Sequence, residues 1–307
     1  MHQNSLIGID LGGTKTEVIL LDRQSNEHFR KRVPTPAGDY RATLDTIRAL
    51  VLAAEAQAGA TGLPVGIGIP GSVSGITGRI KNGNSTWING QPMQQDLREL
   101  LQRPVTLTND ANCLALSEAT DGAGKSHQVI FAAILGTGCG AGISVNGRVV
   151  TGPNGVASEW GHNPLAWTPQ TELEQRPCFC GRHGCNETFL SGTGLSLTHK
   201  LQAGQELPAR DIAANARKGD PVANETMNLY LEHLTRGLAV VINVLDPDVI
   251  VLGGGMSNVD LIYRELPPRL AKYVFGGECG TPVVRAVHGD SSGVRGAAWL
   301  ARSMAST

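Results

Sequence analysis

Three cysteines stand within eight residues of one another: Cys178, Cys180 and Cys185. Thiolates at such short spacing are typical ligands of zinc, which prefers four donors in a tetrahedral arrangement. His162 is the preferred fourth ligand, because His183 lies inside the loop and is too constrained to reach the same ion. Four protein ligands leave no open position, so we expect a structural zinc. Reduced cysteines in an ordinary loop are the alternative.

Two glycine-rich turns each follow one short apolar run and precede another. The first carries Asp10, Gly12, Gly13, Thr14 and Lys15, and the second carries Gly136, Thr137, Gly138 and Gly140. Glycine lets backbone N–H groups approach an anion closely, and threonine and lysine add further donors. A carboxylate at a strand end, such as Asp10, can hold Mg²⁺. The two turns together predict a polyphosphate site, with ordinary hairpin turns as the alternative.

Polar residues that could act on a hydroxyl group follow another apolar strand. Ligands of α/β sheets bind beyond the carboxyl ends of the strands, where Asp110 could accept a proton and Asn109 could hydrogen-bond a polyol. Asp110 could instead cap the helix that begins at Ala111. Glu159 and Glu187 flank the cysteine loop. With an asparagine and a histidine they could grip sugar hydroxyls, and solvated side chains are the alternative.

Several other glycine-containing stretches are candidates for nucleotide binding. Gly254 and its two glycine neighbours end an apolar strand and could let a flat nucleoside lie against the backbone, although such turns also join ordinary strands to helices. The stretches 66–71 and 136–141 fit the letters of the dinucleotide fingerprint, but no helix follows either of them. The stretch 124–126 resembles the end of a phosphate-binding P-loop that lacks its leading glycine. These three stretches are therefore excluded.

Strands that alternate with helices must position these residues, which predicts an α/β architecture. Apolar runs indicate strands at 6–10, 18–21, 65–69, 105–107, 128–135, 141–145 and 249–252. Helical spacing of apolar residues indicates helices at 40–58, 96–101, 111–118, 221–244 and 294–301. Both halves of the chain begin with a strand, a glycine turn and a second strand. An old internal repeat would produce this pattern, as would the chance recurrence of a hairpin.

Composition excludes several classes of protein. The 307 residues allow two domains, and the formal net charge of −1 argues against an overall polybasic nucleic-acid or membrane binder. Aromatic residues make up only 4%, too few for a platform that stacks single strands. No apolar run is long enough for a membrane helix, and the N-terminal residues lack the pattern of a signal peptide. We therefore expect a cytoplasmic protein with no nucleic-acid or membrane partner.

The motifs taken together resemble the ROK family of sugar kinases. The matching stretches are 10–15, 109–110, 136–140, 159–162, 178–187 and 246–255, in family order over nearly the whole chain. The resemblance implies an actin-like, ribonuclease H-like α/β fold with two domains around a cleft. The expected domains are 1–118, completed by a C-terminal helix at about 290–307, and a larger domain at 119–289 that carries the zinc loop. It also suggests a homodimer.

The resemblance assigns roles to the candidate residues. It implies Mg²⁺-ATP held by the two glycine turns, with the nucleoside near Gly254, and Asp110 as the base that deprotonates a sugar hydroxyl. The sugar ligands it implies are Gly71, Asn109, Asp110, Glu159, His162 and Glu187. His162 would hold zinc through one ring nitrogen and face the sugar with the other.

Within the family, the stretches 84–90 and 274–278 resemble bacterial fructokinases that also accept mannose. The expected reaction is therefore phosphorylation of fructose at its 6-hydroxyl, with possible side activity on mannose or glucose. N-acetylglucosamine kinase and then glucokinase are the alternatives among kinases. A sugar-responsive repressor of this family would carry a DNA-binding segment before the first glycine motif, which begins by residue 10. A catalytically silent sugar-binding module is the remaining alternative.

Overall fold

The computed structural model describes residues 5–302, apart from the side chain of Asp290, and divides them into two compact units. The first unit comprises 5–125, 142–157 and 287–302, and the second comprises 126–141 and 158–286. The domain limits expected from the sequence, 1–118 and 119–289, stay a prediction. Residues 303–307 of the expected C-terminal helix lie outside the described part of the chain, as do residues 1–4. No helix in the described part is long and apolar enough to cross a membrane.

A five-stranded mixed sheet forms the centre of the first unit, with strand order β3-β2-β1-β4-β7. Its strands are β1 (Leu6–Leu11), β2 (Lys15–Leu21), β3 (Glu27–Pro34), β4 (Val65–Ile69) and β7 (Val105–Asn109). The first three strands pair antiparallel through tight turns, whereas β4 and β7 run parallel to β1. The carboxyl ends of β1, β4 and β7 therefore lie side by side at one edge of the sheet.

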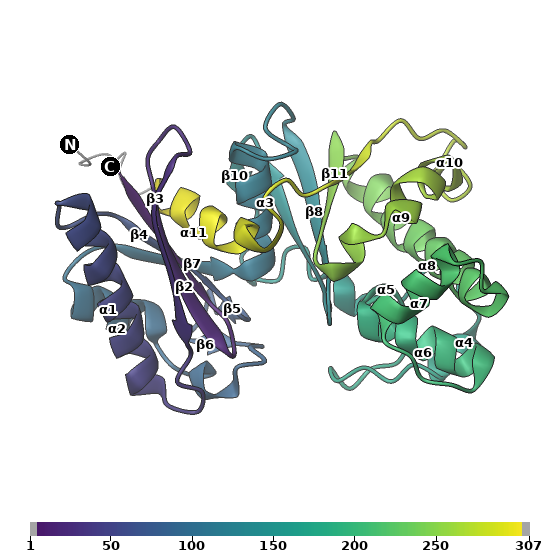
Figure 1. The fold of residues 1–307 in the computed structure, drawn as a ribbon, viewed down its shortest axis with the longest axis horizontal. Helices are drawn as coiled ribbons and strands as arrows, with labels where there is room; N and C mark the ends of the chain where they lie inside the picture. Colours follow the sequence, from purple (N-terminus) through teal and green to yellow (C-terminus); the bar gives the residue numbers. More distant parts are fainter. Residues whose placement is uncertain (1–4, 303–307) are drawn as a thin grey trace. The chain divides into compact units, whose positions relative to one another are not determined.

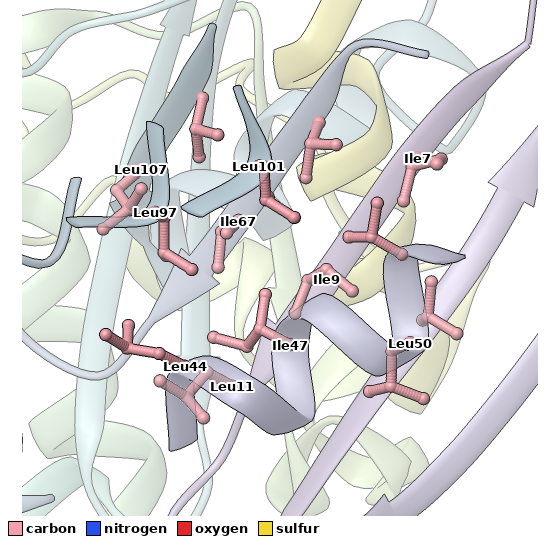
Figure 2. Close-up of a cluster of buried hydrophobic side chains, with 14 of the residues drawn as sticks. Ile7, Ile9, Leu11, Leu44, Ile47, Leu50, Ile67, Leu97, Leu101 and Leu107 are labelled. Atoms are coloured by element: carbon pink, nitrogen blue, oxygen red, sulfur yellow. The ribbon is translucent and has the colours of Figure 1, made fainter. Parts of the chain in front are cut away.

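Helices cover both faces of this sheet, because side chains alternate between the faces along each strand. On one face, α1 (Tyr40–Ala58) and α2 (Met93–Leu101) pack on a large apolar cluster that includes Ile7 and Ile9 of β1. Figure 2 shows Ile9 beside Ile47 of α1 within this cluster. On the other face, α3 (Asp110–Thr120) and α11 (Ser292–Arg302) pack around Leu6, and Figure 1 shows α11 opposite α1 and α2.

The helix α11 approaches the first sheet so closely that only glycine fits at the contact. A Cβ atom on Gly66 of β4 would lie 2.0 Å from the carbonyl oxygen of Ala297, and one on Gly8 of β1 would lie 2.3 Å from that of Val294. These distances are far inside van der Waals contact, so the backbone of α11 rests directly on the strands.

A second mixed sheet has the strand order β10-β9-β8-β11-β12. Its strands are β8 (Val129–Leu135), β9 (Cys139–Val145), β10 (Arg148–Val149), β11 (Val249–Gly253) and β12 (Val283–Arg285). The far end of β9 and all of β10 belong to the first unit. Gly142 explains this placement, because a Cβ atom there would lie 2.4 Å from the Ala111 carbonyl oxygen of α3.

The second unit carries most of the remaining helices. They are α4 (Gln170–Glu174), α5 (Glu187–Leu190), α6 (Gly192–Ala203), α7 (Ala209–Arg217), α8 (Pro221–Leu245), α9 (Asp260–Glu265) and α10 (Pro267–Leu270). The longest, α8, begins where Asp220 accepts a hydrogen bond from the Ala223 N–H group and proline occupies the first helical turn. Two short strands, β5 (Ser72–Val73) and β6 (Ile80–Lys81), form a separate hairpin in the first unit.

Candidate functional site

The first glycine turn lies between β1 and β2 and is held by backbone contacts. The Gly12 N–H group donates to the Lys15 carbonyl oxygen at 3.0 Å, and the Thr35 hydroxyl donates to the Gly12 carbonyl oxygen at 2.8 Å. A Cβ atom on Gly12 would lie 2.8 Å from the Lys15 carbonyl oxygen. Gly13, Thr14 and Lys15 are exposed, so the tip of the turn is accessible to a ligand.

Asp10 precedes this turn on the α11 face of the sheet. It lies opposite Glu17 in the register of β1 and β2, and the first turn of α11 lies beside its carboxylate. Burial, followed by the negative charges of Asp110 and Glu17, raises the pKa of Asp10 to about 7. A cation or a hydrogen-bond donor supplied by a ligand would stabilise the ionised form.

This raised pKa predicts a pH-dependent cost to folding. The Asp10 contribution to stability is fully present below its ordinary pKa of 3.8 and is lost as pH rises toward about 7, because the folded state resists ionisation. Asparagine does not ionise, so we expect Asp10→Asn to remove this loss. The change in unfolding free energy that the substitution causes should be more favourable at pH 8 than at pH 4 by roughly 2–4 kcal/mol. Thermal unfolding from pH 4 to 8, without added magnesium, measures the difference.

The control for this prediction is Asp45→Asn, at an exposed position of α1. It should leave the melting temperature close to that of the unmodified protein, as expected for a surface substitution. A constant difference between Asp10→Asn and the unmodified protein across the same pH range would contradict the prediction.

Asn109 and Asp110 lie where β7 ends and α3 begins. Asn109 is the N-cap, because its Oδ1 accepts the Ala111 N–H group at 2.8 Å, and Asp110 is the first residue of the helix. Asp110 Oδ1 also accepts the Ala111 N–H group, at 2.7 Å, so both side chains contact the start of α3. The Asn109 side chain also donates from Nδ2 to the Gly71 carbonyl oxygen at 3.1 Å. Each of its polar atoms can still form one further bond to a ligand.

Gly71 is held by a rigid neighbouring loop. Its φ is +90°, and a Cβ atom there would lie 2.5 Å from the Lys81 carbonyl oxygen. Asn89 fixes this loop by bonding both the N–H group and the carbonyl oxygen of Gly83, at 2.9 and 2.8 Å. The first unit thus brings Asp10, Gly71, Asn109 and Asp110 to adjacent strand ends, where α/β sheets bind ligands.

The second glycine turn, between β8 and β9, is braced by the segment 187–193. The Cys139 N–H group donates to Glu187 Oε2 at 3.0 Å, and the Gly136 carbonyl oxygen accepts the Gly192 N–H group at 2.7 Å. The Thr193 hydroxyl donates to the Thr137 carbonyl oxygen at 2.8 Å. The Gly136 N–H group donates to the Gly138 carbonyl oxygen at 3.0 Å. The expectation that this turn offers its backbone N–H groups to an anion therefore changes for Gly136 and Cys139, whose N–H groups are already bonded.

Two further predicted residues lie against the second glycine turn. Gly254 has a φ of +79°, and a Cβ atom there would lie 2.7 Å from the Leu135 carbonyl oxygen. A Cβ atom on Gly161 would lie 1.9 Å from the Cys139 carbonyl oxygen, so the short helix η2 (Trp160–His162) rests on the start of β9. Glu159 immediately precedes this helix and is partly buried. The second unit thus places Gly254, Glu187 and the helix that follows Glu159 against one turn.

The predicted metal ligands converge in the second unit. One donor atom from each of His162, Cys178, Cys180 and Cys185 lies within 4.8 Å of the other three. The Cys178 Sγ and His162 Nδ1 atoms are 3.5 Å apart, and the Cys180 and Cys185 Sγ atoms are 3.6 Å apart. His183 is not part of this group, in agreement with the choice of His162.

The chemistry of this donor set suits a soft divalent metal ion. Burial and the two neighbouring thiols raise the pKa of Cys185 to about 12, so without a cation the thiol keeps its proton. A metal ion would take the place of such protons and neutralise the crowded sulfurs. Three sulfurs and one imidazole nitrogen are a complete tetrahedral set for zinc.

Two residues near this loop were missed by the sequence reasoning. Phe179 lies edge-on to the His162 ring, with 5.1 Å between centroids, although its side chain is largely exposed. Arg176 is buried behind the loop at 2% exposure. No pattern in the sequence marks Arg176, since arginine is mostly an exposed residue.

The model of the ROK family matches residues 6–304. N-acetyl-D-glucosamine kinases of Pectobacterium atrosepticum and Vibrio cholerae are each 40% identical over 297 residues, covering 95% of this chain and 97% and 98% of theirs. The ROK hexokinase structure from Thermus thermophilus superposes with a TM-score of 0.87 at 30% identity, over 98% of this chain and 99% of that one. The structure of a ROK glucokinase from Streptomyces griseus, solved with glucose and AMPPNP, superposes with a TM-score of 0.78 at 28% identity. The match covers 97% of this chain and 99% of that one. These matches confirm the actin-like α/β fold.

Proposed function

The chain belongs to the ROK family and is a sugar kinase, and from this premise we propose that it transfers the γ-phosphoryl group of ATP to the 6-hydroxyl of a hexose. The observation that carries the proposal is the position of Asp110. Its carboxylate heads α3 at the end of β7, next to the Asn109–Gly71 contact, where a hydroxyl group bound at the strand ends would meet it.

N-acetylglucosamine is the first candidate substrate. Its support comes from relatives named N-acetyl-D-glucosamine kinase, which are 39–40% identical to this chain along almost its whole length. They favour this sugar over fructose, the substrate expected first from the sequence. Fructose is kept as the second candidate because of the stretches 84–90 and 274–278. The first of these contains Asn89, which fixes the loop beside Gly71.

In the proposed mechanism, Asp110 takes the proton as the 6-hydroxyl oxygen attacks the γ-phosphorus and the bond to the β,γ-bridging oxygen breaks. Gly71, Asn109, Glu159, His162 and Glu187 hold the other hydroxyls of the sugar. His162 faces Cys178 through Nδ1, which leaves Nε2 as the ring atom for the sugar. Alignment of the two reacting groups supplies a large part of the rate.

For ATP, we propose that each unit supplies one glycine turn. Thr14 and Lys15 are exposed at the first turn and can donate to phosphate oxygens, and Asp10 can hold the accompanying Mg²⁺. The second turn contributes Thr137, Gly138 and Gly140, while Gly254 offers a side-chain-free surface for the nucleoside beside it. We also propose that the protein is a homodimer, which sedimentation analysis would test.

For the cysteine loop, we propose a structural zinc held by His162, Cys178, Cys180 and Cys185. Bound zinc would cross-link the loop that precedes α5 and would fix the orientation of the His162 ring. With all four positions occupied by protein ligands, zinc has no place for a substrate oxygen. The metal therefore shapes the sugar site without entering the reaction.

Cys180→Ser tests this zinc site. Cys180 is exposed, so serine there should disturb the packing little while removing one of the four ligands. We expect bound zinc to fall from about one ion per chain to near zero and the melting temperature to drop by several degrees. Elemental analysis and thermal unfolding measure both effects. Cys279→Ser is the matched control, because Cys279 lies outside the donor set. A zinc-free Cys180→Ser protein with unchanged stability and activity would refute the structural role.

The proposed function is tested by measuring ADP release from Mg²⁺-ATP with N-acetylglucosamine, fructose, mannose and glucose. We expect the highest kcat/KM with N-acetylglucosamine. A preference for fructose would favour the second candidate and leave the mechanism in place. Absence of turnover with all four sugars, in folded and zinc-replete protein, would contradict the kinase proposal.

A further inference from the structure

Arg176 is an unexpected residue to find at the base of the cysteine loop. At 2% exposure it heads the largest fully buried side chains of the described chain, and a buried guanidinium is costly unless it is well bonded. Its backbone closes the loop from both sides. The N–H group of Arg176 donates to the Leu173 carbonyl oxygen at 3.1 Å, and its carbonyl oxygen accepts the Gly184 N–H group at 2.8 Å.

The Arg176 side chain leaves the loop and contacts two helices. It donates to the Thr188 carbonyl oxygen of α5 at 2.7 Å and to the Thr198 hydroxyl of α6 at 3.0 Å. The guanidinium also lies 4.0 Å from the centre of the Phe189 ring, and its Nη2 atom lies 3.8 Å from a Glu172 carboxylate oxygen. The Arg176 side chain therefore joins the cysteine loop to α5, the helix that begins with Glu187.

A helix as short as α5 cannot hold its own orientation. It comprises the four residues Glu187–Leu190, and a single helical turn is unstable without outside contacts. The Thr188 carbonyl oxygen, bonded to Arg176, belongs to the residue directly after Glu187. The carboxylate of Glu187 is bonded on its own account, because its Oε2 atom accepts the Cys139 N–H group. Arg176 thus bonds the backbone of α5 one residue away from Glu187, whose carboxylate braces the second glycine turn.

We propose that Arg176 is a positioning residue, which fixes the Glu187 carboxylate for sugar binding and for bracing the second glycine turn. The proposal rests on the proposed function in so far as Glu187 contacts the sugar. Lysine does not replace arginine here, because its single ammonium nitrogen cannot both bond the Thr188 carbonyl oxygen as Nη1 does and stack a planar group on the Phe189 ring. A shift of α5 by a fraction of an ångström is enough to misplace a carboxylate that binds hydroxyls.

The first test is a double-mutant cycle in sugar kcat/KM with Arg176→Lys and Glu187→Ala. We expect Arg176→Lys to lower kcat/KM by about tenfold in the unmodified protein but by less than about twofold once Glu187 is alanine, because nothing remains to be positioned. Thr198→Val is the control, since it removes the α6 contact of the same guanidinium and leaves the Thr188 contact in place. It should change stability and leave kcat/KM within about twofold.

The second test needs no turnover, so it separates this inference from the proposed function. The Cys139 N–H group is protected by Glu187 Oε2, and we expect its hydrogen exchange to accelerate at least about tenfold in Arg176→Lys but not in Thr198→Val. Unchanged exchange at Cys139, or an equal loss of kcat/KM in both backgrounds of the cycle, would overturn the inference. Inactive wild-type protein with the expected exchange would contradict the kinase proposal alone.

Discussion

Replacing Asp110 with asparagine is expected to lower kcat by roughly 10²–10⁴-fold and to change the KM for the sugar by less than about threefold. Asparagine keeps the size of the side chain and can still hydrogen-bond the 6-hydroxyl, but it cannot accept the proton. The position also tolerates asparagine structurally, because an amide oxygen can still accept the Ala111 N–H group that Asp110 Oδ1 accepts at 2.7 Å, and the N-cap Asn109 is unchanged. Steady-state kinetics on the preferred sugar, with ATP saturating, measures both constants.

The matched control for Asp110→Asn is Asp39→Asn. Asp39 also stands at the start of a helix of the first unit, where its Oδ1 accepts the Ala42 N–H group of α1 at 2.9 Å. Asparagine is an equally good cap, so stability and kcat should both stay near their original values. An Asp110→Asn protein that retains more than about a tenth of the original kcat would show that another group, or water, takes the proton.

Replacing Gly66 with alanine is expected to destabilise the protein by about 4 kcal/mol or more. The added Cβ atom would lie 2.0 Å from the Ala297 carbonyl oxygen and 2.9 Å from the Ala301 nitrogen, and both are backbone atoms of α11. The helix must move away from β4, which opens the apolar cluster around Trp299. Thermal unfolding should show a melting temperature lower by roughly 10 °C or more.

Gly280→Ala is the control for this substitution, because a Cβ atom there meets nothing within 4 Å. It should leave the melting temperature within about 2 °C of the original, as expected for a surface change. If Gly66→Ala were as stable as Gly280→Ala, the close packing of α11 on the sheet would not exist in solution.

Local patterns predicted the regular elements of the fold well. The helix at 40–58 and the strand at 65–69 appear with the predicted bounds, because their apolar spacing matches the faces they bury. The helix predicted from residue 96 begins at Met93 instead, where a buried methionine joins the core. That start depends on packing against the sheet, which a local pattern does not contain.

The candidate site was predictable where its residues are neighbours in the sequence or occupy strand ends. The cysteine loop with His162 and the group at the carboxyl ends of β1 and β7 belong to this class. The bond from Cys139 to Glu187 joins residues 48 positions apart, and the Arg176 side chain is bonded to two separate helices, α5 and α6. Such contacts arise only when the elements are packed, so residue type and spacing could not reveal them.

The glycine-mediated contact between α11 and the sheet has a consequence during synthesis. The strands β1 and β4 are made early, but the helix that covers their second face comes from residues 292–302. At the usual rate of translation, the roughly 170 residues between the end of α3 and the start of α11 take about 10–30 s to emerge. Throughout that interval the part of the sheet that α11 covers, around Gly8 and Gly66, stays exposed to chaperones. We therefore expect the first unit to complete its packing only after α11 has emerged.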